Sequence, residues 1–333
     1  MAKTVADQMV EVFAAAGVRR IYGLFDCHRS RLPVVAIAAH IPSPEIGSGF
    51  FQETHPEQLF LECSSYCELV SSPAQMPRVL EIAIRRAVAE SCVCVVIPGD
   101  VALRPASDAP VPSTAALLLP APVVTPPPQA VTALAEMLDA SGRVTLLCGR
   151  GCEGAHAELL QLAEALKAPI VHAMRGKEHV EWDNPYDVGM TGLIGFSSGY
   201  YAMGSCDALL MLGTDFPYTQ FYPKGARIAQ VDLRPEAVGR RTPIELGLVG
   251  DVRATVQALL PHLKAQRDDK HLRTCVSHYQ DARPGLDELA SGKPGGRLIP
   301  STSPARSASL RRTTRCSPAT WACPRCGRRA TCG

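Results

Sequence analysis

The sequence predicts an α/β protein whose parallel sheets are covered by helices, and three observations lead to this fold class. Amphipathic helical patterns alternate with short apolar runs along most of the chain, which is typical of parallel sheets. The chain has 333 residues, enough for two domains, and 46% of them are apolar, enough for two buried cores. Eight prolines between Pro105 and Pro128 mark an extended linker between the two domains.

The first domain is expected over residues 1–110. Apolar side chains at Val5, Met9 and Val12 recur with helical spacing, so residues 4–17 predict a helix that Gly17 ends. The elements expected after it are a strand over residues 19–28, a buried parallel strand over 33–39, a helix over 77–90 and a second buried strand over 93–97.

The linker is expected over residues 111–127 without regular structure, and a doubly wound domain over residues 128–265. In that domain the pattern predicts helices over residues 130–141, 155–166, 197–202 and 252–263 and strands over 144–148, 169–172, 208–212 and 226–232. Residues 266–292 are expected to form a linker helix, and residues 293–333 a disordered basic tail.

Charge and cysteine content separate the tail from the rest of the chain. Residues 293–333 carry one Lys, eight Arg and no acidic residue, whereas the other 292 residues carry 25 basic against 32 acidic side chains. The thirteen cysteines are irregularly spaced and several lie inside apolar runs, so we expect reduced core residues rather than a disulfide framework. No apolar run is long enough for a membrane span and no signal peptide is apparent, so we expect a cytoplasmic protein.

A glycine-rich turn lies between a predicted strand and a predicted helix. Residues 149–154 read Gly-Arg-Gly-Cys-Glu-Gly and match G-x-G-x-x-G, a pattern that brings the backbone and a helix N-terminus close to a phosphate. Tight strand-to-helix turns also use glycine without binding a ligand. Gly213-Thr214-Asp215-Phe216 and Asp232 end two further predicted strands, where an acidic side chain can bind ribose hydroxyls. The alternative for Asp232 is a helix N-cap or a turn residue.

Several segments carry a family resemblance that spans residues 1 to about 292. They are Asp26-Cys27-His28-Arg29, Ala39-His40-Ile41-Pro42, Phe51-Gln52-Glu53-Thr54-His55-Pro56, Arg175-Gly176-Lys177-Glu178-His179, the run from Asp187 to Gly195, and Gly213-Thr214-Asp215-Phe216-Pro217-Tyr218. With these segments the chain resembles the pyruvate oxidase family of thiamine-diphosphate-dependent enzymes, in particular the bacterial quinone-dependent pyruvate dehydrogenases. The resemblance implies a pyrimidine-binding domain, a central FAD domain and a diphosphate-binding domain.

The resemblance implies an activity, cofactors and site residues. The implied reaction converts pyruvate, quinone and water into acetate, CO₂ and quinol with thiamine diphosphate, Mg²⁺ and FAD, in a homotetramer that associates peripherally with the inner membrane. Phe51 and Gln52 would line the substrate end, although the residue type alone favours a core or surface aromatic at Phe51. The implied FAD contacts are Arg175, Thr191, Gly192, Leu193, Gly213, Thr214, Asp215, Phe216, Pro217 and Asp232.

The sequence also departs from this family. It contains neither the Arg-His-Glu-Glu segment, whose glutamate protonates the aminopyrimidine, nor the Gly-Asp-Gly…Asn motif that holds Mg²⁺ and the diphosphate. Roughly sixty residues, about two βαβ units, are missing after Tyr22-Gly23. We therefore expect an internally deleted, truncated member that is inactive in decarboxylation, has a poorly stable first domain and binds FAD weakly at most.

The basic tail has its own interpretation. Permitted codons for residues 315–333 spell, in another frame, a peptide that resembles the opening of the family's diphosphate domain, so we expect a frameshift near residues 298–300. The competing readings are a zinc knuckle formed by Cys316, Cys323, Cys326 and Cys332 and a nucleic-acid-binding arm, but only one C-x2-C spacing is present. We expect neither nucleic acid nor zinc as a ligand.

Two other functions stay open for the whole chain. An acetolactate-synthase-like carboligase would share the domain plan, and a nucleotide-binding fold without chemistry would need only the central domain.

Overall fold

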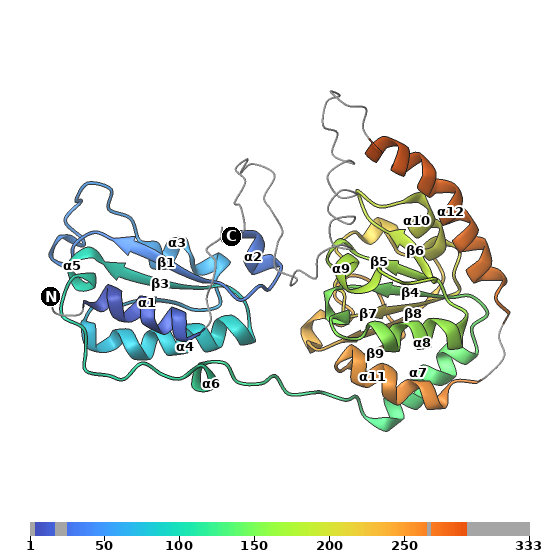
Figure 1. The fold of residues 1–333 in the computed structure, drawn as a ribbon, viewed down its shortest axis with the longest axis horizontal. Coiled ribbons are helices and arrows are strands. Elements are labelled where there is room, and N and C mark those ends of the chain that lie inside the picture. Colours follow the sequence, from blue (N-terminus) through green and yellow to red (C-terminus); the bar gives the residue numbers. More distant parts are fainter. Residues whose placement is uncertain (1–3, 17–24, 265–267, 292–333) are drawn as a thin grey trace. The chain divides into compact units, whose positions relative to one another are not determined.

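The computed structural model describes residues 4–16, 25–264 and 268–291 of the chain (Figure 1). The chain divides into two compact units, Met1–Pro122 and Val123–Gly333, and each contains a parallel sheet of its own. None of the helices in these ranges is both long and apolar enough to cross a membrane.

The first unit contains a three-stranded sheet with the order β1-β3-β2. Its strands are β1 (Val35–His40), β2 (Cys67–Leu69) and β3 (Val93–Pro98), and all pairs are parallel. The helices are α1 (Val5–Ala15), α2 (Phe25–Arg29), α3 (Pro56–Leu59), α4 (Met76–Ala89), α5 (Gly99–Ala102) and α6 (Thr114–Leu117), with short 3-10 turns at Ser43–Glu45, Leu61–Cys63 and Pro73–Gln75.

Helices α1 and α4 bury their apolar faces against one side of this sheet. A capping box between Thr4 and Asp7 fixes the start of α1, because each residue's side chain accepts a hydrogen bond from the other's backbone amide. Leu80 and Ile84 of α4 pack with the buried valines of β3 in one apolar core. The predicted helices over 4–17 and 77–90 and the strand over 93–97 are therefore confirmed.

Three expectations for the first unit are wrong in part. The strand predicted over residues 19–28 is a helix where the structure describes it, at Phe25–Arg29, because a short apolar run does not distinguish the two; residues 17–24 lie outside the described ranges. Strand β1 is present, but as an edge strand without a buried side chain. The proline-rich segment contains α6, whose Leu117 is buried in the core of the unit.

The second unit contains a six-stranded parallel sheet with the order β6-β5-β4-β7-β8-β9. The strands are β4 (Val144–Cys148), β5 (Ile170–His172), β6 (Asp187–Met190), β7 (Ala208–Leu212), β8 (Arg227–Asp232) and β9 (Leu246–Val249). The helices are α7 (Pro128–Asp139), α8 (His156–Leu166), α9 (Lys177–Val180), α10 (Ser197–Gly204), α11 (Val252–Leu259) and α12 (Lys270–Ser291), with 3-10 turns at Arg150–Cys152, Met174–Gly176, Thr219–Phe221, Pro235–Ala237 and Leu260–His262.

Helices cover both faces of this sheet, as Figure 1 shows. Alternate strand residues such as Leu146 and Leu210 pack with α7, α8 and α11, whereas Leu147 and Leu209 pack with α10 and α12 on the other face. The predicted α/β class and the doubly wound parallel sheet are thus confirmed. Strands β6 and β9 were not predicted from the sequence, and each is only four residues long.

The helix expected over residues 266–292 is present as α12, and it packs against α10 and β6. Cys275 is buried in the core on this face, and Tyr279 packs against it. A Cβ atom on Gly189 of β6 would lie 3.1 Å from the Tyr279 ring, so a glycine there leaves room for the helix. This segment is therefore a packed layer of the second unit, not only a connection.

A buried histidine and aspartate lie side by side in the sheet of the second unit. Nε2 of His172 on β5 is 3.4 Å from Oδ1 of Asp187 on β6, and neither atom has a hydrogen-bond partner. Burial lowers the pKa of His172 to about 3, and the charge of Lys177 also lowers it. Burial raises the pKa of Asp187 to about 7, although the Gly189 amide, Lys177, Tyr279 and Arg283 oppose this shift. Between these values His172 is neutral and Asp187 protonated, so the pair is a neutral contact and not an ion pair.

Substitution of either member should reveal opposite pH dependences of stability. In the unfolded chain the single proton lies on the histidine between about pH 4 and 6.5, and in the folded chain it lies on Asp187. The two shifts therefore cancel in this window. In Asp187→Asn the lowered pKa of His172 remains, so the unfolded state binds more protons and the free energy of unfolding should rise with pH, by up to ~1.4 kcal/mol per pH unit. In His172→Asn the raised pKa of Asp187 remains, so the same free energy should fall with pH.

Urea unfolding of the full chain at three pH values between 4.5 and 6.5 measures these slopes relative to the unsubstituted protein. Slopes of the same sign in the two variants would contradict the assignment.

Candidate functional site

The carboxyl ends of the strands in the second unit form the candidate site. Strand β4 lies next to β5 on one side and β7 on the other, so the chain reverses its direction across the sheet between β4 and β7. Ligands of doubly wound sheets bind outside the carboxyl ends of the strands at such a reversal. The loops after β4, β5, β6, β7 and β8 all lie at the carboxyl ends of the strands, called the carboxyl edge below. They carry the FAD contacts expected in the second unit.

The glycine-rich turn after β4 packs against the loop after β7. The Gly151 amide donates to the Gly213 carbonyl at 2.9 Å, and the Gly149 amide donates to the Leu212 carbonyl at 3.0 Å. A Cβ on Gly213 would lie 2.4 Å from the Gly151 Cα, and a Cβ on Gly149 would lie 2.5 Å from the Gly213 oxygen. Gly149 and Gly151 are therefore required by contact with the chain's own backbone, which is the structural alternative to a phosphate cradle.

Thr191, Gly192 and Leu193 follow β6. The Thr191 amide donates to the His172 carbonyl at 3.1 Å, but its buried hydroxyl has no hydrogen-bond partner. Gly192 has a φ of +108°, which a residue with a side chain rarely adopts, and it packs against Phe216. Leu193 and its neighbour Ile194 are each 67% exposed, so an apolar surface lies next to the buried hydroxyl.

The loop after β7 is fixed by hydrogen bonds and ion pairs. Thr214 is buried, and its carbonyl accepts a hydrogen bond from the side-chain amide of Gln230 at 3.2 Å. The Asp215 carboxylate forms ion pairs with Arg240 and Arg241, the latter at 2.9 Å. Phe216 is buried in an aromatic cluster, and Pro217 is exposed.

Asp232 ends β8 and Arg175 follows β5, so the two residues lie on opposite sides of the β4–β7 pair in the strand order. Asp232 ends β8 and is 4% exposed, and its Oδ1 accepts a hydrogen bond from the Arg234 amide at 3.0 Å. One carboxylate oxygen of Asp232 therefore bonds to the backbone of the following turn, as expected for a turn residue. Arg175 lies in the 3-10 turn after β5 and is partly buried.

Three arginines at the carboxyl ends of the strands were not among the site residues predicted from the sequence. Arg234 contacts Asp232, and Arg240 and Arg241 contact Asp215, so each carboxylate of the site has a basic neighbour. The Arg-Arg pair at 240–241 was visible in the sequence, but only the fold places it beside the loop after β7. Guanidinium groups are suited to bind phosphate oxygens.

The two remaining predicted site residues lie in the first unit. Phe51 is 79% exposed, and Gln52 is exposed with a φ of +61°. Their loop is held by Glu53, whose carboxylate accepts hydrogen bonds from backbone amides including that of Gly49 at 2.6 Å. Phe51 is thus a surface aromatic within its unit, as one alternative held.

No group of three or more His, Cys, Asp or Glu side chains in the described ranges could hold a metal ion. The cysteines proposed for a zinc knuckle lie outside these ranges.

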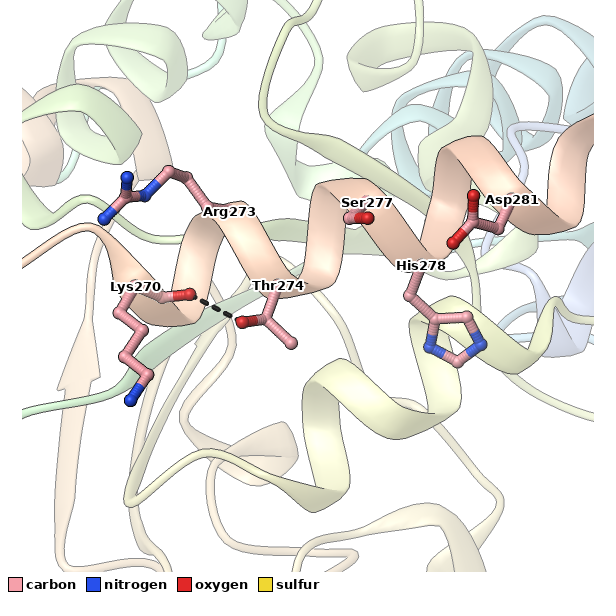
Figure 2. A pocket seen from close by; sticks show the side chains of 6 residues that line it. All are labelled: Lys270, Arg273, Thr274, Ser277, His278 and Asp281. Carbon is pink, nitrogen blue, oxygen red and sulfur yellow. Dashed lines mark hydrogen bonds between the residues drawn. The ribbon is translucent and has the colours of Figure 1, made fainter.

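A separate pocket lies along α12 (Figure 2). Its lining residues are Lys270, Arg273, Thr274, Ser277, His278 and Asp281, which all belong to one helix. The Thr274 hydroxyl donates to the Lys270 carbonyl at 2.8 Å. Because all six side chains project from a single helix, this surface offers no convergent set of donors for a ligand.

Gly213→Ala should strongly destabilise the second unit. The added methyl group would meet the Gly151 backbone, and the φ of +56° disfavours any side chain, so we expect a loss of more than about 3 kcal/mol or failure to fold. Gly204→Ala is the matched control, because nothing lies within 4 Å of its added methyl group in α10. Urea unfolding of both variants measures the difference, and equal stabilities would refute the role of the Gly213–Gly151 contact.

Comparison with known proteins matches most of the second unit to a known domain. Residues 131–259 match the central domain of thiamine pyrophosphate enzymes. The chain is 64% identical over 311 residues to the uncharacterized 42.6 kDa protein in isoamylase 3'region of Pseudomonas amyloderamosa, covering 93% of this chain and 78% of that protein.

Other relatives share less sequence identity with the chain. The chain is 31% identical over 277 residues to the thiamine pyrophosphate-containing protein YdaP of Bacillus subtilis, covering 81% of this chain, and 26% identical over 287 residues to pyruvate oxidase of Lactiplantibacillus plantarum, covering 84%. It spans 47% of the length of each of these two proteins. Acetolactate synthases match as well. Residues 131–259 therefore carry the central domain of thiamine pyrophosphate enzymes, and the relatives that the chain matches include enzymes of that family.

Proposed function

We propose that this chain binds FAD along the carboxyl edge of the β4–β9 sheet, as the flavin-binding part of a pyruvate oxidase of the quinone-dependent type. The single observation that carries the proposal is the buried Thr191 hydroxyl without a hydrogen-bond partner. An unpaired buried hydroxyl costs about 1–3 kcal/mol, which a ligand that completes its hydrogen bond would offset. The resemblance of the surrounding segments to the pyruvate oxidase family names FAD as that ligand.

The donors at this edge fit a dinucleotide. Arg175 and the arginines beside Asp215 and Asp232 carry the positive charge that a diphosphate group needs. The Asp232 carboxylate can accept a hydrogen bond from a ribose hydroxyl. The exposed Leu193 and the partly exposed Tyr218 offer apolar surface for a flavin ring. When bound, FAD would supply the transfer of electrons from an oxidised substrate to an acceptor.

Thiamine diphosphate is the cofactor of the family, but the sequence does not contain the Gly-Asp-Gly…Asn motif on which its Mg²⁺-dependent binding relies. We therefore assign no step of thiamine chemistry to the described residues. This proposal includes pyruvate as the substrate, a quinone as the electron acceptor, a tetrameric assembly and a cytoplasmic location.

FAD binding is tested by titrating full-length protein into FAD and following the quenching of flavin fluorescence. We expect weak, saturable binding. Thr191→Val should weaken it about fivefold, because it removes one hydrogen bond worth ~1 kcal/mol. Asp232→Ala should weaken it by about 1–3 kcal/mol. The matched control is Thr132→Val on the exposed face of α7, which should leave the affinity unchanged.

Three outcomes of this titration would contradict the proposal. No quenching at high micromolar protein would exclude FAD, and an unchanged affinity in Thr191→Val would mean that water satisfies the hydroxyl. Equal affinity for ADP and FAD would favour the nucleotide-binding module without flavin chemistry.

The chain by itself should not release CO₂ from pyruvate in the presence of thiamine diphosphate, Mg²⁺ and a quinone. The reason is that its sequence has neither the family's Arg-His-Glu-Glu segment nor its Gly-Asp-Gly motif; a missing general acid–base group alone typically costs 10²- to 10⁴-fold in rate. A coupled assay for CO₂ and acetate measures this, and thiamine-dependent turnover would refute it. Acetolactate as the product would favour the carboligase alternative.

A further inference from the structure

The two faces of the small sheet in the first unit have different chemistry. On one face Val93, Val95 and Ile97 of β3 pack into the core with α1 and α4. Side chains alternate along a strand, so Cys92 and Cys94 point to the other face. Three more cysteines gather with them, since Cys94 interacts with Cys63 and Cys67, and Cys92 interacts with Cys27 and Cys63. These cysteines are reduced, so this face is a layer of thiols.

Within this layer, Cys67 and Cys94 are placed opposite each other on paired strands. They are direct partners in the parallel register of β2 and β3, and the Cys94 amide donates to the Tyr66 carbonyl at 2.8 Å. The two thiols affect each other's pKa, since Cys94 lowers the pKa of Cys67 and Cys67 raises that of Cys94. Neighbouring strands lie about 4.8 Å apart, which is within the roughly 4.4–6.8 Å between Cα atoms that a disulfide spans.

The two members of this pair differ in exposure. Cys67 is partly exposed on the edge strand β2, whereas Cys94 is fully buried on the central strand. A small reagent therefore meets Cys67 first, and Cys94 lies behind it. The rival pair, Cys27 and Cys92, is less accessible, because these residues are 9% and 0% exposed.

We propose that Cys67 and Cys94 form a dithiol–disulfide pair that low-molecular-weight disulfides oxidise reversibly. The Cys67 thiolate attacks one sulfur of the small disulfide, so that a mixed disulfide forms and one small thiolate leaves. The Cys94 thiolate then attacks the Cys67 sulfur, closes the Cys67–Cys94 bond and releases the second small thiolate. The two protons of the protein thiols end on the two released thiols, and the small disulfide is the species reduced.

The local environment makes this exchange slow at neutral pH. Burial raises the pKa of Cys67, and the charges of Glu57 and Glu68 raise it as well, while hydrogen bonds with Cys94 and Ser64 lower it. Burial raises the pKa of Cys94 to about 12. Since the thiolate is the nucleophile, the oxidation is best followed at mildly alkaline pH over hours.

The test incubates the full chain with oxidised glutathione at about pH 8.5 and maps the disulfides after alkylation and digestion. We expect a crosslinked peptide pair that contains Cys67 and Cys94. Thiols titrated after denaturation should fall from thirteen to eleven per chain, and dithiothreitol should restore them. A stable glutathione adduct on Cys67, or a crosslink between Cys27 and Cys92 in place of the expected one, would overturn the proposal.

Variants separate this pair from the other thiols. Cys67→Ser should abolish the crosslink, and Cys27→Ser should leave its yield unchanged. Cys275→Ser is the control for a buried thiol in the second unit. If Cys67→Ser still loses two thiols on oxidation, Cys63 or Cys92 has taken its place and the assignment is wrong. Because the disulfide map of the unsubstituted chain decides on its own, a variant that fails to fold leaves the proposal testable.

Discussion

The contact between two glycine loops, at Gly151 and Gly213, is the constraint on which the candidate site depends. The Gly213 carbonyl accepts a hydrogen bond from the Gly151 amide at 2.9 Å, and a Cβ atom on either glycine would overlap the opposing backbone. This approach holds the loops after β4 and β7 together where the chain reverses its direction across the sheet.

Polar interactions extend this constraint to β8. The buried Gln230 donates to the carbonyls of Thr214 and Ala237 and accepts from the Gly239 amide, so one side chain links the loops after β7 and β8. Asp215 is held by the two arginines that follow this second loop. The edge is thus organised by its own hydrogen bonds, whereas the Thr191 hydroxyl beside it has no hydrogen-bond partner. That difference separates the framework of the site from the group available to a ligand.

The two units use their sheets differently. In the second unit, apolar helices cover both faces, as the two cores on opposite sides of the sheet show. In the first unit, the valines of β3 face one core, and thiols occupy the other face. The edge strand β1 has no buried side chain there, and Ile37 is 37% exposed. A sheet with so little apolar cover relies on one face for its stability.

The sequence by itself determined the α/β class, most helices and strands of the second unit and the family resemblance, because apolar periodicity and strand-end glycines are local signals. It did not reveal β2, β6 and β9, which are three or four residues long and are defined by pairing with their neighbours. Only the tertiary structure decided that Gly149 and Gly151 contact Gly213, that Arg240 and Arg241 pair with Asp215, and that Cys67 lies opposite Cys94. These are contacts between residues distant in the chain, and no local pattern encodes them.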